Sequence, residues 1–112
     1  MQNALKSFKL ITELATFVFK AGGSEFDVHF KEKDQEIKIS IESRIENLNL
    51  SNLRESLKGL NTERQSEVEE YYWELAGESN TSEELTLVGM MIDNAEFSYE
   101  DDILKITVYR HK

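Results

Sequence analysis

The same succession of elements occurs twice in this chain: an amphipathic helix is followed by two strands of alternating polarity. Apolar residues at helical spacing occupy residues 4–21, and alternating apolar residues follow over 26–30 and 37–41. A similar succession ends the chain, and a helical insert separates the two copies. Because alternation gives strands with one buried face, helices must cover that face. The sequence therefore predicts an α+β fold, a two-layer α/β sandwich in the order α-β-β-α-α-α-β-β, with the helices on one face of the sheet.

The first copy is the more clearly delimited of the two. Its helix has one wide apolar face, made of Ala4, Phe8, Leu10, Ile11, Leu14, Ala15, Phe17, Val18 and Ala21. Gly22 and Gly23 end this helix, because glycine adopts the left-handed conformation that closes a helix C-terminus. The polar residues 32–36 then join the two alternating segments into a hairpin. Its inward side chains are expected to be Phe26, Val28, Phe30, Ile37, Ile39 and Ile41.

The insert is expected to be helical. Leucines at helical spacing cover residues 50–60. A capping box, Thr62 with Gln65, then begins a further helix, which ends at Gly77. These helices are the part of the chain that has no counterpart in the repeated succession.

The segment 82–93, with which the second copy begins, fits two patterns. Thr81 and Glu84 form a capping box, and a helix starting there has one apolar face made of Leu85, Val88 and Ile92. A strand would instead present Leu85, Leu87, Gly89 and Met91 on one face. We favour the helix because its start signal is local. Two alternating strands follow, and they meet at a turn formed by Asp101 and Asp102.

Composition excludes several classes of function. The chain of 112 residues suits one domain, and its net charge of −9 repels phosphate backbones, so we expect no nucleic-acid partner. No apolar run reaches the ~18 residues of a membrane span. Charged residues interrupt the segment 1–14, so we expect no signal peptide, no membrane partner and a cytoplasmic location. Without cysteine the chain has no disulfide, thiolate metal site or cysteine nucleophile.

In its order of elements the chain resembles the GHKL ATPases, the Bergerat-fold family that includes the catalytic domains of histidine kinases. Residues 11–23 look like that family's first helix, which typically has the pattern E-L-x-x-N-A-x-K-x-G. Residues 85–93 are similar to its later helix, which usually has the pattern G-x-G-L-x-L-V. The resemblance implies a Bergerat-like sheet with the helices on one face.

The positions that handle nucleotide in that family carry other residues here. Phe17 stands where the family has its magnesium-binding asparagine, and residues 42–47 replace the D-x-G-x-G that contacts adenine. Residues 82–84, Ser-Glu-Glu, replace the glycines beside the triphosphate. Glutamates at a helix N-terminus cancel the dipole field that attracts phosphate. The resemblance therefore implies a pseudo-ATPase that binds no cofactor.

Other residue types offer no catalytic or metal site. His29 and His111 are far apart in the sequence, and without cysteine they do not complete a zinc site. The acidic residues around Asp101 lack the alternating ligands and central glycine of a calcium loop. We therefore expect no catalytic, cofactor-binding or metal-binding residue.

Three consecutive aromatic residues, Tyr71, Tyr72 and Trp73, are the candidate protein-contact residues. On a helix they point about 100° apart, so they cannot all face one core, and exposed aromatics are enriched at interface hot spots. We expect a non-catalytic cytoplasmic regulatory or protein-interaction domain, with a protein partner or self-association through helices in 50–76. The alternative is a divergent ATP-binding phosphotransferase that uses Glu13 as its general base.

Overall fold

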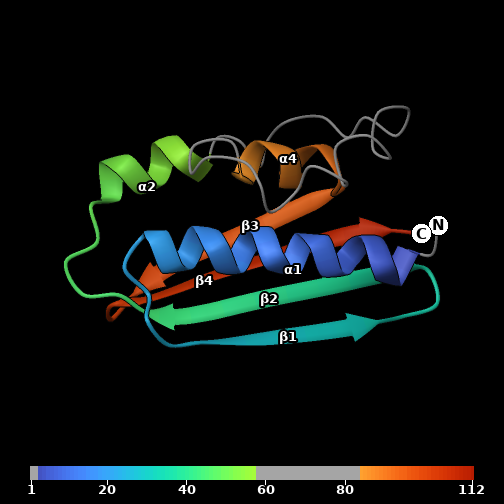
Figure 1. The fold of residues 1–112 in the computed structure, drawn as a ribbon, viewed down its shortest axis with the longest axis horizontal. Helices are drawn as coiled ribbons and strands as arrows, with labels where there is room; N and C mark the ends of the chain where they lie inside the picture. Colours follow the sequence, from blue (N-terminus) through green and yellow to red (C-terminus); the bar gives the residue numbers. More distant parts are fainter. Residues whose placement is uncertain (1–2, 58–83) are drawn as a thin grey trace.

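The fold is an antiparallel sheet with helices packed on one side of it (Figure 1). A computed structural model describes residues 3–57 and 84–112. The elements are α1 (Asn3–Lys20), β1 (Phe26–Glu32), β2 (Glu36–Arg44), α2 (Leu50–Leu57), α4 (Glu84–Met90), β3 (Asn94–Glu100) and β4 (Ile103–His111). The predicted α+β class is confirmed, and the described elements contain two successions of a helix and two strands. Of the predicted insert helices, only the part covered by α2 lies within the described residues.

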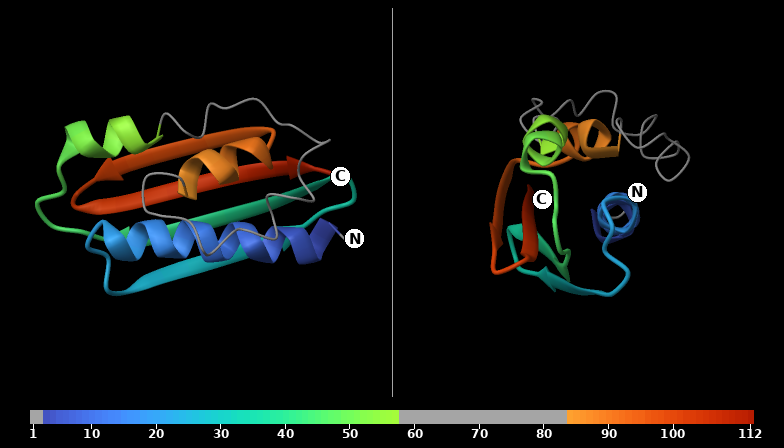
Figure 2. Two further views of the ribbon diagram at one scale, coloured as in Figure 1. Left: turned by 45° about the horizontal axis from the view of Figure 1, so that its top comes forward. Right: turned by 90° about the vertical axis from the view of Figure 1, so that its left-hand side faces the viewer.

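The four strands lie in the order β1-β2-β4-β3, and every neighbouring pair is antiparallel. The two central strands, β2 and β4, supply the buried face of the sheet through Ile37, Ile39, Ile41, Leu104, Ile106 and Val108. α1 and α4 lie on that face and contact each other (Figure 2). The opposite face is polar, and the hydroxyls of Ser40 and Thr107 form a hydrogen bond of 3.2 Å at its centre.

The register of the sheet gives it an internal twofold symmetry. The two hairpins have the same pairing when residues 67 positions apart are matched. At this offset the pairs Phe30–Ile39 and Val28–Ile41 of the first hairpin correspond to Phe97–Ile106 and Ala95–Val108 of the second. Ser40 and Thr107, which are also 67 residues apart, face each other where β2 meets β4, so they mark the symmetry axis. The succession seen twice in the sequence is therefore a repeat of the structure as well.

Two glycines close α1, as the sequence predicts. The Gly22 N–H donates to Phe19 O at 3.1 Å, the Gly23 N–H donates to Val18 O at 2.9 Å, and Gly22 has a φ of 113°. This pair of bonds is a Schellman motif, in which the residue after the helix takes a positive φ. A Cβ on Gly23 would lie 2.5 Å from Ser43 Oγ on β2, so glycine lets the chain pass close to the sheet.

The segment 84–92 is helical at its start, which confirms the favoured of the two predictions. α4 ends at Met90, and the side chains of Leu85, Val88 and Ile92 are buried, as the helical spacing requires. Arg110 of β4, itself buried, donates from Nη1 to Met91 O at 2.7 Å. This bond holds the C-terminal end of α4 against the sheet.

The expectation that the alternating residues of β1 and β3 are buried is wrong in part. Val28 and Phe30 of β1 and Phe97 of β3 are exposed, although they lie on the helix-covered face. Both strands are edges of the sheet, and α1 contacts β1 and β2 from above their shared seam. Alternation shows which side chains share a face, but the position of the strand in the sheet decides how deeply that face is covered.

Candidate functional site

α1 carries apolar side chains on its solvent side as well as on its core side. The core side consists of Leu10, Leu14, Phe17 and Val18, all buried. On the solvent side Leu5 and Phe8 are each 49% exposed, and Phe19 is 67% exposed. These three belong to one stripe of residues three or four positions apart, Leu5, Phe8, Thr12, Thr16 and Phe19. The stripe contains no charged residue along the length of the helix.

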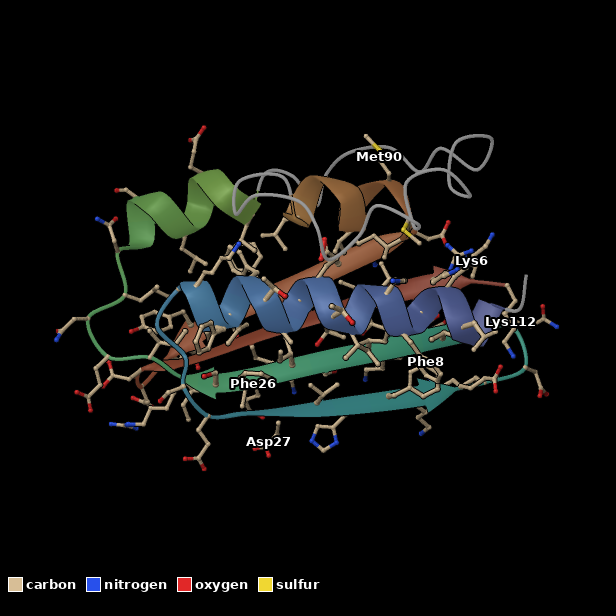
Figure 3. The ribbon with its side chains drawn as sticks, viewed as in Figure 1. Lys6, Phe8, Phe26, Asp27, Met90 and Lys112 are labelled. Carbon is tan, nitrogen blue, oxygen red and sulfur yellow. The ribbon has the colours of Figure 1, made fainter. Side chains whose placement is uncertain are left out.

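The two threonines of this stripe add little polarity to it. The Thr12 hydroxyl donates to Phe8 O at 3.2 Å, and the Thr16 hydroxyl donates to Thr12 O at 2.7 Å. Both hydroxyls are therefore directed back to the helix backbone. The charged residues of α1, Lys6, Lys9, Glu13 and Lys20, all fall on the other flank of the helix. Figure 3 shows Lys6 on the α4 side of the helix and Phe8 on the β1 side.

The apolar surface of α1 continues onto the edge strand. The rings of Phe8 and Phe30 are in tilted contact, with centroids 5.5 Å apart and planes at 54°. Phe30 is 37% exposed and Val28 is 36% exposed. We call Leu5, Phe8, Phe19, Val28 and Phe30 the α1–β1 strip. An exposed apolar surface shared by two elements is the usual mark of an interaction site.

β1 adds an open hydrogen-bonding edge beside this strip. In the sheet formed by the described residues, β1 pairs with β2 alone, and its register runs without interruption from Phe26 to Glu32. The strand contains no proline and no bulge, two features that commonly protect an edge. The backbone groups on its outer side are thus available to another strand.

On the polar face, side chains of β2, β3 and β4 pair with one another. The Tyr109 hydroxyl donates to Glu96 Oε1 at 2.7 Å, and Lys38 Nζ lies 5.9 Å from the centre of the Tyr109 ring. The hydrogen bond to Glu96 is the main cause that raises the pKa of Tyr109 above its ordinary value of 10.0, and burial raises it further. Such self-paired polar groups make this face a weaker candidate for recognition than the α1–β1 strip.

A hollow of about 480 Å³ lies at one end of the sheet, between the start of β1, the end of β2 and the start of β4. Its lining consists of Ser24, Glu25, Asp27, Glu42, Ser43, Arg44 and Ile103. Three carboxylates face one guanidinium, and Arg44 lies within 4 Å of two further carboxylates, on Glu46 and Asp102. This charge balance disfavours a phosphate ligand. Over residues 3–57 and 84–112, no group of three or more His, Asp or Glu residues is placed to hold a metal ion.

Residues singled out from the sequence lie elsewhere. Phe17, Ser43 and Glu13 are buried, and Glu13 is only 1% exposed. The Ser43 hydroxyl donates to Glu25 O at 2.7 Å. His29 is exposed on β1, whereas His111, at the end of β4, donates its backbone N–H to Asp93 Oδ2 at 2.7 Å. The structure therefore does not bring the two histidines together.

The three candidate protein-contact residues, Tyr71, Tyr72 and Trp73, lie outside the described residues. The sequence reasoning missed the α1–β1 strip because it assigned Phe8 to the core face of the first helix. The sequence does contain an indication of the strip. Leu5 and Phe19 are large apolar residues that lie outside the core positions of that helix.

Comparison of the chain with protein-family models, with curated proteins and with solved structures finds no significant match. None of the described helices is long and apolar enough to cross a membrane. The interpretation of the α1–β1 strip therefore depends on its geometry and chemistry.

Proposed function

We propose that this chain is a non-catalytic cytoplasmic domain that acts through protein contacts. The observation that carries the proposal is the uncharged stripe on the solvent side of α1, with its continuation onto β1. A helix that covers one sheet has a polar outer face when water is its only other neighbour. The apolar outer face of α1 is what a surface covered by another macromolecule would have, and this supports the proposal.

The free energy gained by covering the α1–β1 strip can be compared with the cost of association. Complete burial of a large apolar side chain contributes about 1.5–3 kcal/mol, so covering the exposed parts of the five strip residues contributes roughly 4–7 kcal/mol in total. Association itself costs about 4–15 kcal/mol in lost freedom of motion. The α1–β1 strip therefore needs additional polar or backbone contacts to form a stable complex, and the open edge of β1 offers them.

We further propose that the domain is a regulatory relative of the histidine-kinase-type ATPases that has lost nucleotide binding. The resemblance in the order of elements motivates this, and the burial of Glu13 and Phe17 supports it. A base on Glu13 would have to act from a side chain that is almost fully enclosed. The acidic lining of the hollow beside Ser43 is a second feature that disfavours a bound triphosphate.

Thermal unfolding in the presence of ATP or ADP, with and without magnesium, tests the loss of nucleotide binding. We expect no concentration-dependent change in Tm, because a ligand raises Tm only when it binds the folded state. A saturable rise in Tm would contradict this part of the proposal and favour the phosphotransferase alternative.

Cross-linking in the native cell tests the protein contact. The wild-type chain is compared with a variant carrying Leu5→Ser, Phe8→Ser and Phe19→Ser, and with a control carrying Lys105→Ser on the polar face. We expect the cross-linked species of the wild type to be retained by the control and lost from the strip variant. Identical species in all three proteins, with circular dichroism showing all three folded, would exclude the α1–β1 strip as the contact surface.

A further inference from the structure

We propose that the α1–β1 strip is covered by a second copy of this chain, through antiparallel pairing of the two β1 strands about a twofold axis at His29. The inference rests on the proposed function, because it names the partner of the same surface. The product is a continuous sheet of eight strands, built from two four-stranded sheets.

Two pairs of positions in β1, 27 with 31 and 28 with 30, are complementary in this arrangement. His29 is the midpoint of the seven-residue strand Phe26–Glu32, so an axis there pairs the strand over its full length. Asp27 then lies opposite the partner's Lys31, and the same ion pair forms again on the other side of the axis. Val28 lies opposite the partner's Phe30, also twice. Cross-strand pairs of opposite charge and of apolar side chains are the units that stabilise antiparallel sheets.

Both charged side chains are available for these contacts. Asp27 and Lys31 are exposed, and within residues 3–57 and 84–112 neither side chain forms a hydrogen bond or an ion pair. Figure 3 shows Asp27 on the side of β1 that faces away from α1. Glu32, the third charged group of the seam, is already paired with Lys112 Nζ at 2.9 Å. In the proposed β1–β1 contact, each unpaired carboxylate of Asp27 therefore meets one unpaired ammonium group of Lys31 from the other copy.

In the proposed dimer the helices of both copies lie on the same side of the joined sheet, next to the β1–β1 contact. A twofold axis perpendicular to the sheet keeps the two helical layers on one side, so the exposed Phe8, Val28 and Phe30 of each copy face those of the other. The chain already contains one joint of this kind, where β2 meets β4 about the internal axis at Ser40 and Thr107. The proposed dimer repeats at β1 the arrangement that the monomer has at its centre.

The other edge of the sheet lacks this complementarity. The charged residues of β3 are Glu96 and Glu100, so two β3 strands bring together charges of one sign. The whole chain carries a net charge of −9, and two copies repel each other at long range. Self-association therefore needs local pairs of opposite charge, and among the two described edges β1 is the one that has them.

Sedimentation velocity on charge-reversed variants tests the dimer and its register. We expect the wild type to dimerise at about 100 μM, and Asp27→Lys or Lys31→Glu each to weaken the dimer roughly tenfold, because each places like charges opposite each other twice. A 1:1 mixture of these two variants restores both ion pairs and forms a heterodimer. The double variant D27K/K31E restores the homodimer. Lys105→Glu, on the polar face of β4, is the matched control and leaves the dimer intact.

The outcomes separate this inference from the proposed function. Circular dichroism first establishes that each variant is folded. A wild type that stays monomeric, or a mixture of the single variants that fails to associate, overturns the β1–β1 dimer. If the strip variant still loses its cross-linked species in cells, the protein-contact function stands with a different partner. If the dimer forms and the rescue succeeds, both proposals hold.

Discussion

The close approach of Gly23 to the sheet predicts a stability effect that can be dissected with two substitutions. In Gly23→Ala the new Cβ would lie 2.5 Å from Ser43 Oγ, 2.7 Å from Val18 Cγ1 and 3.1 Å from Val18 O. Overpacking of this kind costs about 1–3 kcal/mol, and here a backbone oxygen is among the crowded atoms. We therefore expect Gly23→Ala to lower the free energy of unfolding by about 2–3 kcal/mol.

A double-mutant cycle identifies the cause. Ser43→Ala removes the closest atom, so Gly23→Ala should cost about 1 kcal/mol less in that background, with Val18 still in the way. Gly22→Ala is the matched control. Its Cβ meets only Ile45 Cγ2 at 3.5 Å, but φ of 113° disfavours any side chain, so a cost of about 1–3 kcal/mol from backbone strain remains in both backgrounds. Urea unfolding followed by circular dichroism measures the free energy of unfolding of all six proteins. An equal cost of Gly23→Ala in both backgrounds would refute the proposed contact with Ser43.

Three further predictions concern the hairpins. The Tyr109 pKa lies above 10.0 mainly through the hydrogen bond to Glu96, so Glu96→Gln should lower it, as measured by NMR titration of the tyrosine ring carbons. Because the neutral phenol is the favoured form, the stability from this bond is present below pH 10 and is lost as the pH rises through the higher folded-state pKa. Tyr99→Phe removes the 2.6 Å bond to Ile45 O and should lower the free energy of unfolding by about 1–2 kcal/mol; an unchanged urea midpoint would contradict this. Asp101→Gly should raise Tm slightly, because a φ of 53° costs a non-glycine residue about 1–2 kcal/mol. The larger conformational entropy that glycine loses on folding offsets part of this gain. A lower Tm would show that the aspartate stabilises the turn.

Sequence patterns predicted the strands more accurately than their burial. The alternation of β1 and β2 is the same, yet Val28 is exposed and its cross-strand partner Ile41 is buried. The difference comes from the order β1-β2-β4-β3, which puts the hairpin's first strand at an edge. Strand order is set by contacts between distant segments, and periodicity within one segment contains no information about it.

The candidate site was harder to predict for a related reason. The helical period shows that α1 has apolar residues at several angles, but it does not show which of them meet the sheet. Phe8 was therefore expected in the core, although it lies at the boundary between α1 and β1 and contacts Phe30. The turn at Asp101 and Asp102 was predictable, because their positive φ values suit a two-residue hairpin and aspartate tolerates that conformation.

The two edges of the internally symmetric sheet differ in charge, and this difference limits how many copies can assemble. Two copies of one hairpin would expose two equivalent edges, and a chain with two self-complementary edges would assemble without limit. Here the edges have different charges: β1 has Asp27 and Lys31 at positions that pair about His29, whereas β3 has Glu96 and Glu100 alone. Like charges on an edge oppose its pairing with another copy. In the proposed dimer the β1 edges are consumed and the acidic β3 edges face outward, so the assembly closes at two copies.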